Sequence, residues 1–211
     1  MKSAFCKVLT ICLIAVAAYS HAETTDKPDV HVGDRWSWQH TNGLVNERDV
    51  TRVEDVVGIS DNEIKTRVRI KGKSGSDIYT YTRDWNPVDI VSAQWTPYLK
   101  RFVFPLEVGK KWDGAADKMV FKGGKHGKFS LTGEVVAFEK VTVPAGTFDA
   151  YKIKLTTDAV STDEDVISGH TEETCWYAPA VRQNVKCEDT FSRDGRVRTM
   201  DIDELLEFNL R

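Results

Sequence analysis

The sequence is poor in the residues that most often carry chemistry. Only five histidines and four cysteines occur among its 211 residues. No serine lies in a nucleophile-elbow pattern, and no glycine-rich loop leads into a helix as a phosphate-binding loop does. These absences argue against hydrolases, nucleotide-binding enzymes and metal enzymes. We therefore expect no catalytic residue, no bound metal and no cofactor.

A long apolar run is also missing. The apolar run at residues 8–18 is too short for a transmembrane helix, which needs about 20 apolar residues. It follows two lysines and precedes Ser20-His21-Ala22, which is the order of segments in a secretory signal. Cys12 is a poor lipidation site, because the bulky Ile11 precedes it and the apolar run continues beyond it. We expect a signal peptide over residues 1–22 with cleavage after its last residue, and a periplasmic or secreted mature chain without a transmembrane segment.

The charge of the mature chain is negative. The signal contains two lysines and no acid, so the mature chain has 27 − 32 = −5 charges. This balance argues against nucleic acid, and against an anionic membrane, as the main partner. The 211 − 22 = 189 remaining residues fit one domain. We expect a polar lead-in at residues 23–29 and a single domain over residues 30–211.

Two cysteines remain after cleavage, Cys175 and Cys187. If two antiparallel strands flank the turn-like residues 178–183, these cysteines face one another across the strand pair. An even number of cysteines in an oxidising compartment favours a disulfide. Their spacing fits neither a redox motif nor a zinc site, so we predict a structural bridge.

The third absence is helical periodicity. Apolar residues instead alternate with polar ones, as in residues 63–70 (EIKTRVRI) and 151–155 (YKIKL). Asn-Gly, Asp-Gly, Gly-Gly and Asn-Pro pairs punctuate these runs. The pattern predicts an all-β protein, an antiparallel meander of about eight to ten strands that forms a strongly curved sheet, half-barrel or barrel. The segment 141–155 reads as a hairpin, with Pro144 in a type I turn and Gly146 in a left-handed, bulge-closing position.

Four phrases occur in a fixed order: VGDRW at residues 32–36, FPLEVGKKW at 104–112, VPAGTFDAYKI at 143–153 and CWYAP at 175–179. Together they resemble a family of secreted bacterial proteins whose domain has no known function. The resemblance covers about residues 30–208 and implies an antiparallel β architecture in the cell envelope. It implies no catalytic residues. The chain departs from the family pattern at Ala180-Val181-Arg182, where the family has Gly-Val-Gly, and this implies a wider turn framed by the cysteine bridge.

Titratable clusters are weak candidates for a site. His170, Glu172 and Cys175 resemble a metal-binding set, but alternation places Cys175 on the opposite strand face. Asp201 and Asp203 share a strand face, and exposure to solvent is the simpler interpretation of such a pair. We therefore predict no metal site.

Aromatic residues are the stronger signal. Trp36 and Trp38 lie two residues apart and hence on one face of a strand. Such rings either fill the core or line a ligand-binding surface, and the sequence leaves both interpretations open. The candidate ligand-lining residues are Trp36, Trp38, Tyr79, Tyr81, Trp95, Trp112 and Trp176.

These features predict a non-enzymatic envelope protein that binds an apolar ligand or docks an envelope partner. A structural or assembly module without a small ligand is the first alternative. A hydrolase is the second, and it would need a pocket that gathers His170 with two carboxylates.

Overall fold

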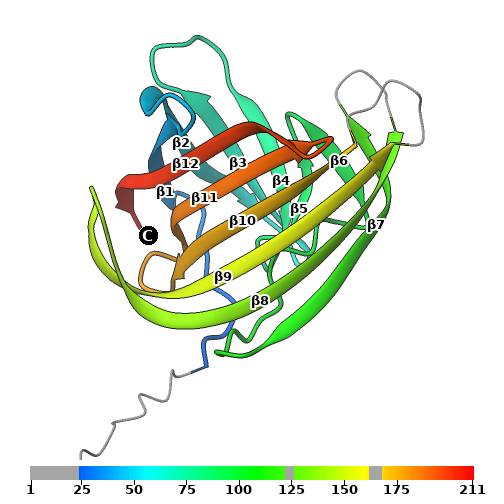
Figure 1. The fold of residues 1–211 in the computed structure, drawn as a ribbon. Helices are drawn as coiled ribbons and strands as arrows, with labels where there is room; N and C mark the ends of the chain where they lie inside the picture. The colour runs from blue at the N-terminus through cyan, green and yellow to red at the C-terminus, as the bar shows by residue number, and fades with distance from the viewer. Residues whose placement is uncertain (1–23, 122–125, 162–167) are drawn as a thin grey trace, which may run out of the picture.

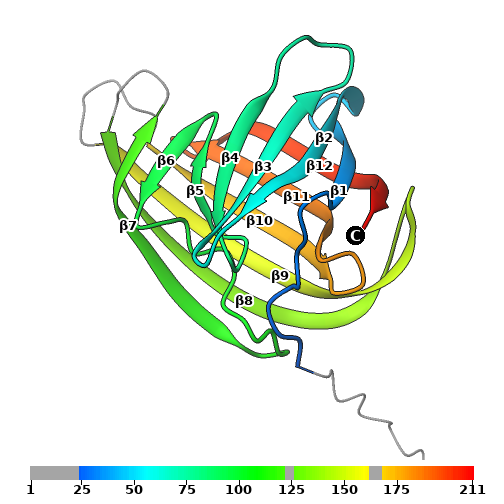
Figure 2. The ribbon, with the colours of Figure 1, turned by 180° about the vertical axis from the view of Figure 1, so that it is seen from behind.

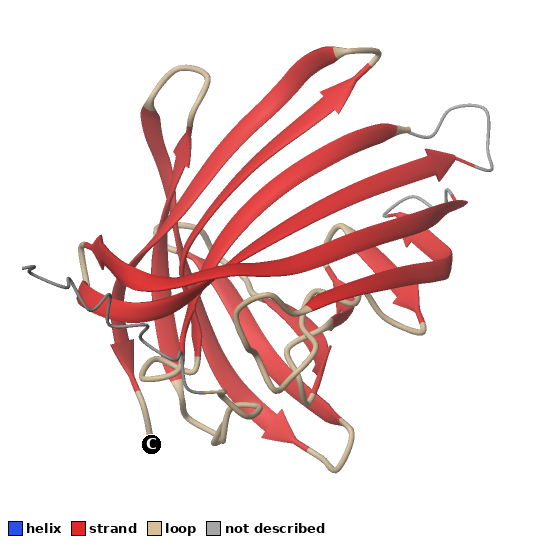
Figure 3. Ribbon diagram, turned by 60° about the horizontal axis from the view of Figure 1, so that its bottom comes forward, coloured by secondary structure: helices blue, strands red, loops and turns tan. Residues whose placement is uncertain are grey.

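The computed structural model describes residues 24–121, 126–161 and 168–211, and this part of the chain folds as β-strands joined by turns and loops (Figures 1 and 3). Within it, no helix has the length and apolar character needed to cross a membrane. The strands of these ranges are β1 (Arg35–Asn42), β2 (Glu47–Ile59), β3 (Glu63–Ile70), β4 (Asp77–Thr82), β5 (Pro87–Ile90), β6 (Ala93–Thr96), β7 (Lys111–Phe121), β8 (His126–Val143), β9 (Gly146–Ser161), β10 (Gly169–Ala178), β11 (Gln183–Arg193) and β12 (Arg196–Asn209).

The strands form an up-and-down meander that closes on itself. Each strand pairs antiparallel with its neighbours in sequence, and β1 pairs with both β2 and β12, which closes the barrel (Figure 1). The predicted all-β, antiparallel and strongly curved architecture is confirmed. The described residues contain twelve strands rather than eight to ten, because β5 and β6 have only four residues each and show too little alternation to be recognised. The predicted signal peptide, residues 1–22, lies outside the described residues.

The meander places alternate turns at opposite ends of the barrel. We call the end with the β1–β2, β3–β4 and β11–β12 turns the open end, and the other the closed end. Residues 97–110, between β6 and β7, cover the closed end and are called the plug segment (Figure 2). Thr25 and Leu106 exchange two backbone hydrogen bonds. The side chain of Asn86 donates to the carbonyl of Phe102 and accepts from its N–H, so the plug is fixed by backbone-directed hydrogen bonds.

Two glycines in the barrel wall make room beside the plug. A Cβ at Gly114 would lie 2.8 Å from the Cβ of Lys100, and a Cβ at Gly133 would overlap the indole of Trp112. That indole donates a hydrogen bond of 3.0 Å to the carbonyl of Lys100. The small residues therefore let the plug and its supporting tryptophan approach the wall closely.

The hairpin in residues 141–155 is confirmed. β8 ends at Val143 and β9 begins at Gly146, and these two residues are directly paired. Pro144 and Ala145 therefore form the two-residue turn. Gly146 has a positive φ of 138°, as predicted, but no bulge accompanies it. The β8–β9 register shifts instead between Val135 and Ala137. The N–H of Ala145 donates to the carbonyl of Leu205, which fixes the hairpin tip on β12.

The predicted disulfide is also confirmed. Cys175 of β10 and Cys187 of β11 are direct cross-strand partners with Cα atoms 4.1 Å apart, and they are bonded to each other. The turn between these strands contains Arg182, which has a φ of 61°. This is the position at which the resembled family has its second glycine, so the arginine occupies a backbone conformation that glycine adopts freely.

Candidate functional site

The inner face of β2 carries charged side chains. Arg52 and Glu54 alternate with outward residues and share the face of the buried Val56. Glu54 is only 2% exposed and accepts a 2.6 Å hydrogen bond from the hydroxyl of Thr66 on β3. The Arg52 guanidinium lies 4.6 Å from the ring centre of Trp38 on β1, in a cation–π contact. The barrel interior is therefore polar beside its aromatic rings.

These residues line a cavity of about 200 Å³, which we call the inner cavity. It lies between strands β1, β2, β4, β10, β11 and β12 and the plug segment. Its aromatic lining consists of Trp38, Tyr81, Trp85 and Phe102. Its polar lining includes Arg52, Glu54, Arg101, Glu173, Gln183, Asn184, Asp189 and Asp203.

Three polar atoms of this lining lack a hydrogen-bond partner. They are Nε of Arg52, Nε of Arg101 and Oδ1 of Asn184, and each is buried. Among the described residues, the other such side-chain atom is Nε1 of Trp95. Buried polar groups are usually paired, so the gathering of three unpaired ones around one cavity requires an explanation.

Arg101 connects the plug segment to the barrel wall. Its Nη2 atom forms an ion pair with Glu173 of β10 and lies 3.4 Å from the disulfide sulfur of Cys175. Its Nε atom has no hydrogen-bond partner and is available to a molecule in the cavity. The plug therefore supplies one wall of the cavity as well as the cover of the closed end.

Acidic groups gather at the same place. Burial, together with the negative charges of Glu173, Asp201 and Asp203, raises the pKa of the Asp189 carboxyl to about 7, against the effect of Arg101. His40 of β1 lies 3.5 Å from Asp201 and 3.2 Å from Asp203. Near neutral pH the Asp189 carboxyl is therefore partly protonated, inside a cluster of like charges.

The same surroundings shift the pKa values of Tyr81 and Arg52. Burial raises the pKa of Tyr81 well above its usual range, and the nearby Glu54 raises it further. Burial acts to lower the pKa of Arg52, but the charges of Glu54 and Asp203 together raise it overall. Both side chains therefore keep their protons, and they serve as hydrogen-bond donors rather than as bases.

The structure separates the predicted ligand-lining residues into three groups. Trp38 and Tyr81 line the inner cavity, and Tyr79 lies beside Tyr81 with ring centres 6.4 Å apart. Trp36, Trp95 and Trp112 belong to the buried core. Trp36 is fully buried and donates to the carbonyl of Val181.

Trp176 forms the third group. It alternates with Cys175 and Tyr177 and so points to the outer face of β10. Its ring is covered there by Lys152 and Lys186, whose Nζ atoms lie 5.0 and 5.4 Å from the ring centre. Its Nε1 donates to Glu139, and this hydrogen bond lowers the pKa of that carboxyl. Trp176 is thus shielded from solvent without facing the cavity.

His170 lies on the outer face of the barrel. Its Nδ1 is 2.9 Å from Asp158 and its Nε2 is 3.9 Å from Glu172, and all three side chains are substantially exposed. The two carboxylates do meet the histidine, but they do so on an exposed strand face rather than in the inner cavity. Within the described ranges, Glu173, Cys175 and Cys187 have metal-like spacing, but both sulfurs are in the disulfide and offer no thiolate.

The sequence analysis missed most of the polar lining. Arg52 and Glu54 were detectable in principle, because strict alternation from Val56 places them on the inner face of β2. Asp201 and Asp203 share a face as predicted, but they point to His40 rather than simply to solvent. No local pattern indicates Arg101 or Asn184, since both reach the cavity through the tertiary fold.

The fold and the site together define a class: a closed antiparallel barrel with a small polar cavity inside. Residues 107–200 match the family model described as DUF3108-like. The match spans the last two phrases of the resemblance and most of the FPLEVGKKW phrase, and it agrees with a family of unknown function. No curated protein matches the chain.

Two solved structures share the fold. A candidate lipoprotein from Parabacteroides distasonis superimposes with a TM-score of 0.58 at 13% identity, over 89% of this chain and 100% of its own. A candidate exported protein from Bacteroides fragilis, described as having a YmcC-like fold, gives a TM-score of 0.52 at 17% identity, over 88% of this chain and 99% of its own. At these identities the likeness establishes the architecture and not a shared activity.

Proposed function

We propose that the chain is an exported, non-enzymatic barrel domain that holds a small polar molecule in the inner cavity. The observation that carries the proposal is the set of three buried, unpaired atoms around that cavity, on Arg52, Arg101 and Asn184. Two of these atoms are donors and one is an acceptor. Together with the rings of Trp38 and Trp85, they match a ligand that has hydrogen-bonding groups of both kinds and one apolar face.

The polar lining changes the kind of ligand expected from the sequence. An apolar molecule would leave the buried donors and the acceptor unpaired, at a cost of about 1–3 kcal/mol each. It would also remove water from the carboxylates of Glu173 and Asp189 without replacing their hydrogen bonds. A polar molecule restores those bonds, and we therefore prefer it to an apolar one.

The size of the cavity limits the ligand. A volume of about 200 Å³ equals six or seven water molecules at roughly 30 Å³ each. This suits a molecule of the size of a monosaccharide or an amino acid, and it excludes a lipid chain or a folded peptide. The remaining alternative is a structural module whose cavity contains only water.

Export is supported by the secretory pattern of residues 1–22. The two structural neighbours, a candidate lipoprotein and a candidate exported protein, are in keeping with it. The non-enzymatic part of the proposal is supported by the sequence motifs, since no nucleophile elbow and no phosphate-binding loop occurs in the chain.

Native mass spectrometry of protein purified gently from the periplasm tests the proposal. We expect a bound small molecule on the wild type and its loss in Asn184→Leu, which replaces the unpaired acceptor by an apolar side chain. This variant should unfold at the same or a higher denaturant concentration, because it removes an unsatisfied buried group. The matched control is Asn209→Leu at the exposed end of β12, which should keep the bound molecule.

Two results would overturn the proposal. One is a wild-type mass equal to that of the bare mature chain, together with no thermal shift from a panel of monosaccharides and amino acids. The other is a bound molecule that remains at full occupancy in Asn184→Leu. The first would favour the structural module with a water-filled cavity, and the second would place the ligand elsewhere.

A further inference from the structure

The open end of the barrel exposes apolar side chains. Leu44 and Val45, at the β1–β2 turn, are 53% and 65% exposed, and Met200 on β12 is 37% exposed. These residues are neighbours, because the N–H of Gly43 donates to the carbonyl of Met200, and a Cβ at Gly43 would lie 2.7 Å from the Cγ of Met200. Apolar side chains that lie together on a surface indicate an interaction site more strongly than scattered ones.

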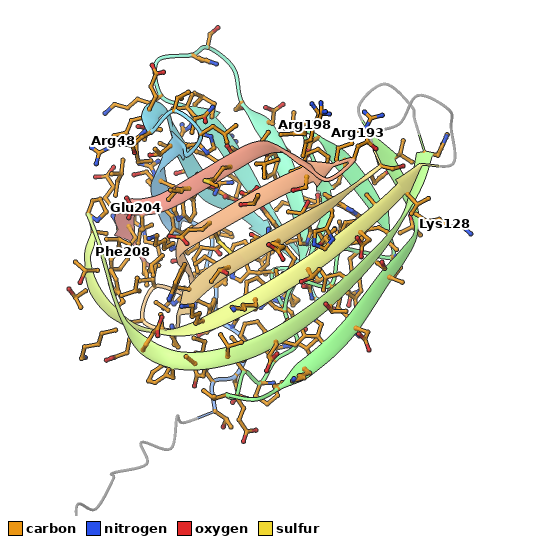
Figure 4. All side chains as sticks on the ribbon, in the orientation of Figure 1. Arg48, Lys128, Arg193, Arg198, Glu204 and Phe208 are labelled. Carbon is orange, nitrogen blue, oxygen red and sulfur yellow. A yellow bond between two sulfur atoms is a disulfide. The ribbon has the colours of Figure 1, made fainter. Side chains whose placement is uncertain are left out.

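Arginines surround these apolar residues. On β12, Arg198 lies two residues from Met200, where the β11–β12 register shifts, and Arg196 lies four residues from Met200, beyond that shift. Arg48 pairs with Thr41 just after the β1–β2 turn. All three are exposed, and within the described part of the chain no ion pair or hydrogen bond engages their guanidinium groups. Figure 4 shows Arg48, Arg193 and Arg198 projecting away from the barrel. The surface formed by Leu44, Val45, Arg48, Arg196, Arg198 and Met200 is called the arginine rim.

The local charge of this region differs in sign from that of the whole chain. Residues 47–49 and 193–198 contain four arginines and three acids, Glu47, Asp49 and Asp194, so their net charge by sequence is 4 − 3 = +1. Among the side chains that the structure describes, Arg193 is the arginine of this group with an ion pair, its Nε being 3.7 Å from Asp194. The net charge of the mature chain, which argued against an anionic membrane, therefore does not describe this surface.

We propose that the arginine rim docks the open end of the barrel on an anionic phospholipid surface. Guanidinium groups form charge-assisted hydrogen bonds with phosphate, and basic residues near an anionic surface add attraction that weakens with salt. The exposed side chains of Leu44 and Val45, at the tip of a turn, enter the headgroup region and bury apolar area there. Charge and apolar exposure together favour a lipid surface over a protein partner, which would usually offer paired acids and a shaped apolar pocket.

Co-sedimentation with vesicles tests this proposal. The probes are vesicles of phosphatidylcholine alone and of phosphatidylcholine with about 30% phosphatidylglycerol. We expect binding only to the anionic vesicles at about 50 mM salt, and several-fold weaker binding at about 300 mM, where screening is stronger. R48Q/R196Q/R198Q should weaken binding roughly fivefold per arginine, and L44S/V45S should weaken it at constant charge.

The matched control is K65Q/K140Q/K154Q, which removes three exposed lysines of the barrel wall and the closed end. It changes the net charge by the same amount and should leave vesicle binding within about twofold of the wild type. Denaturant unfolding should show all variants to be folded, since every substituted residue is exposed. The proposal fails if the wild type ignores the anionic vesicles, if the control loses as much binding as the rim variant, or if L44S/V45S instead abolishes self-association seen by light scattering without vesicles.

Discussion

The Asp34 site at the closed end and the inner cavity treat buried charge in opposite ways. At the closed end, the carboxylate of Asp34 is fully buried and receives three hydrogen bonds. It accepts from the N–H of His31 at 3.0 Å, from the N–H of Arg211 at 2.7 Å and from Nη1 of Arg182 at 2.9 Å. In the inner cavity, Arg52 and Arg101 keep buried nitrogen atoms without a partner.

This difference separates charge that holds the fold from charge that is available to a ligand. Asp34 connects the N-terminal segment, the β10–β11 turn and the C-terminus, so its hydrogen bonds join three segments distant in sequence. The cavity groups on Arg101 and Asn184 instead direct polar atoms without a hydrogen-bond partner toward the cavity. A fully paired buried charge contributes specificity to the fold, whereas a buried polar atom without a partner lowers stability unless something binds to it.

The largest expected effect comes from removing the paired charge. We expect Asp34→Ala to lower the free energy of unfolding by about 3 kcal/mol or more, because it leaves three donors without their acceptor. Urea unfolding measures the loss. Asp149→Ala is the control, since Asp149 pairs with Lys140 on the exposed surface and should cost less than about 1 kcal/mol. Equal losses in the two variants would contradict the special role of the closed end.

The packing of the plug gives the next effect. We expect Gly133→Ala to cost about 2 kcal/mol, because the new methyl group would overlap the indole of Trp112, which supports the plug at Lys100. The control is Gly58→Ala, where the nearest atom, the Cβ of Lys65, is 3.8 Å away. Thermal unfolding of both variants checks the prediction, and an unchanged midpoint in Gly133→Ala would show that Trp112 can move aside.

Arg182 allows a further test of the Asp34 site. Its backbone is strained, and its side chain donates a hydrogen bond to the buried carboxylate of Asp34. Arg182→Ala removes the bond to Asp34 and keeps a side chain at a φ of 61°. Arg182→Gly removes the same bond but relieves the strain, which is worth about 1 kcal/mol. We expect Arg182→Gly to be the more stable of the two variants by roughly that amount in denaturant unfolding. A more stable alanine variant would show that the turn adjusts to a different conformation.

The parts of the fold that the sequence predicted depend on local signals. Alternation in residues 63–70 predicted β3, turn chemistry at Pro144 predicted the β8–β9 hairpin, and the placement of Cys175 and Cys187 about a turn predicted their cross-strand pairing. In each case residues close in sequence determine the local structure, so it can be predicted without the tertiary fold.

The cavity could be predicted only in part, because the usual rule places charged residues outside. Trp38 and Tyr81 were identified from their aromatic character, and both line the cavity. Arg52 and Glu54 face inward because each finds an aromatic ring or a hydroxyl there, a compensation that appears only when β1 and β3 are placed beside β2. Arg101 and Glu173 are 72 residues apart in sequence, and no local sequence pattern predicts their contact.

The smallest expected effect is the response of the cavity to pH. The pKa of Asp189 is about 7 in the folded protein, against an ordinary value of 3.8, so the folded state holds this proton more tightly than the unfolded state does. The contribution of Asp189 to stability is therefore fully present below about pH 4 and is lost as pH rises towards 7 and above. We expect Asp189→Asn to lose less stability than the wild type between pH 6 and pH 7, by about 1 kcal/mol in urea unfolding at each pH. Parallel pH profiles for the two proteins would mean that the Asp189 carboxyl is ionised throughout, and that the positive charge of Arg101 outweighs burial and the charges of Glu173, Asp201 and Asp203.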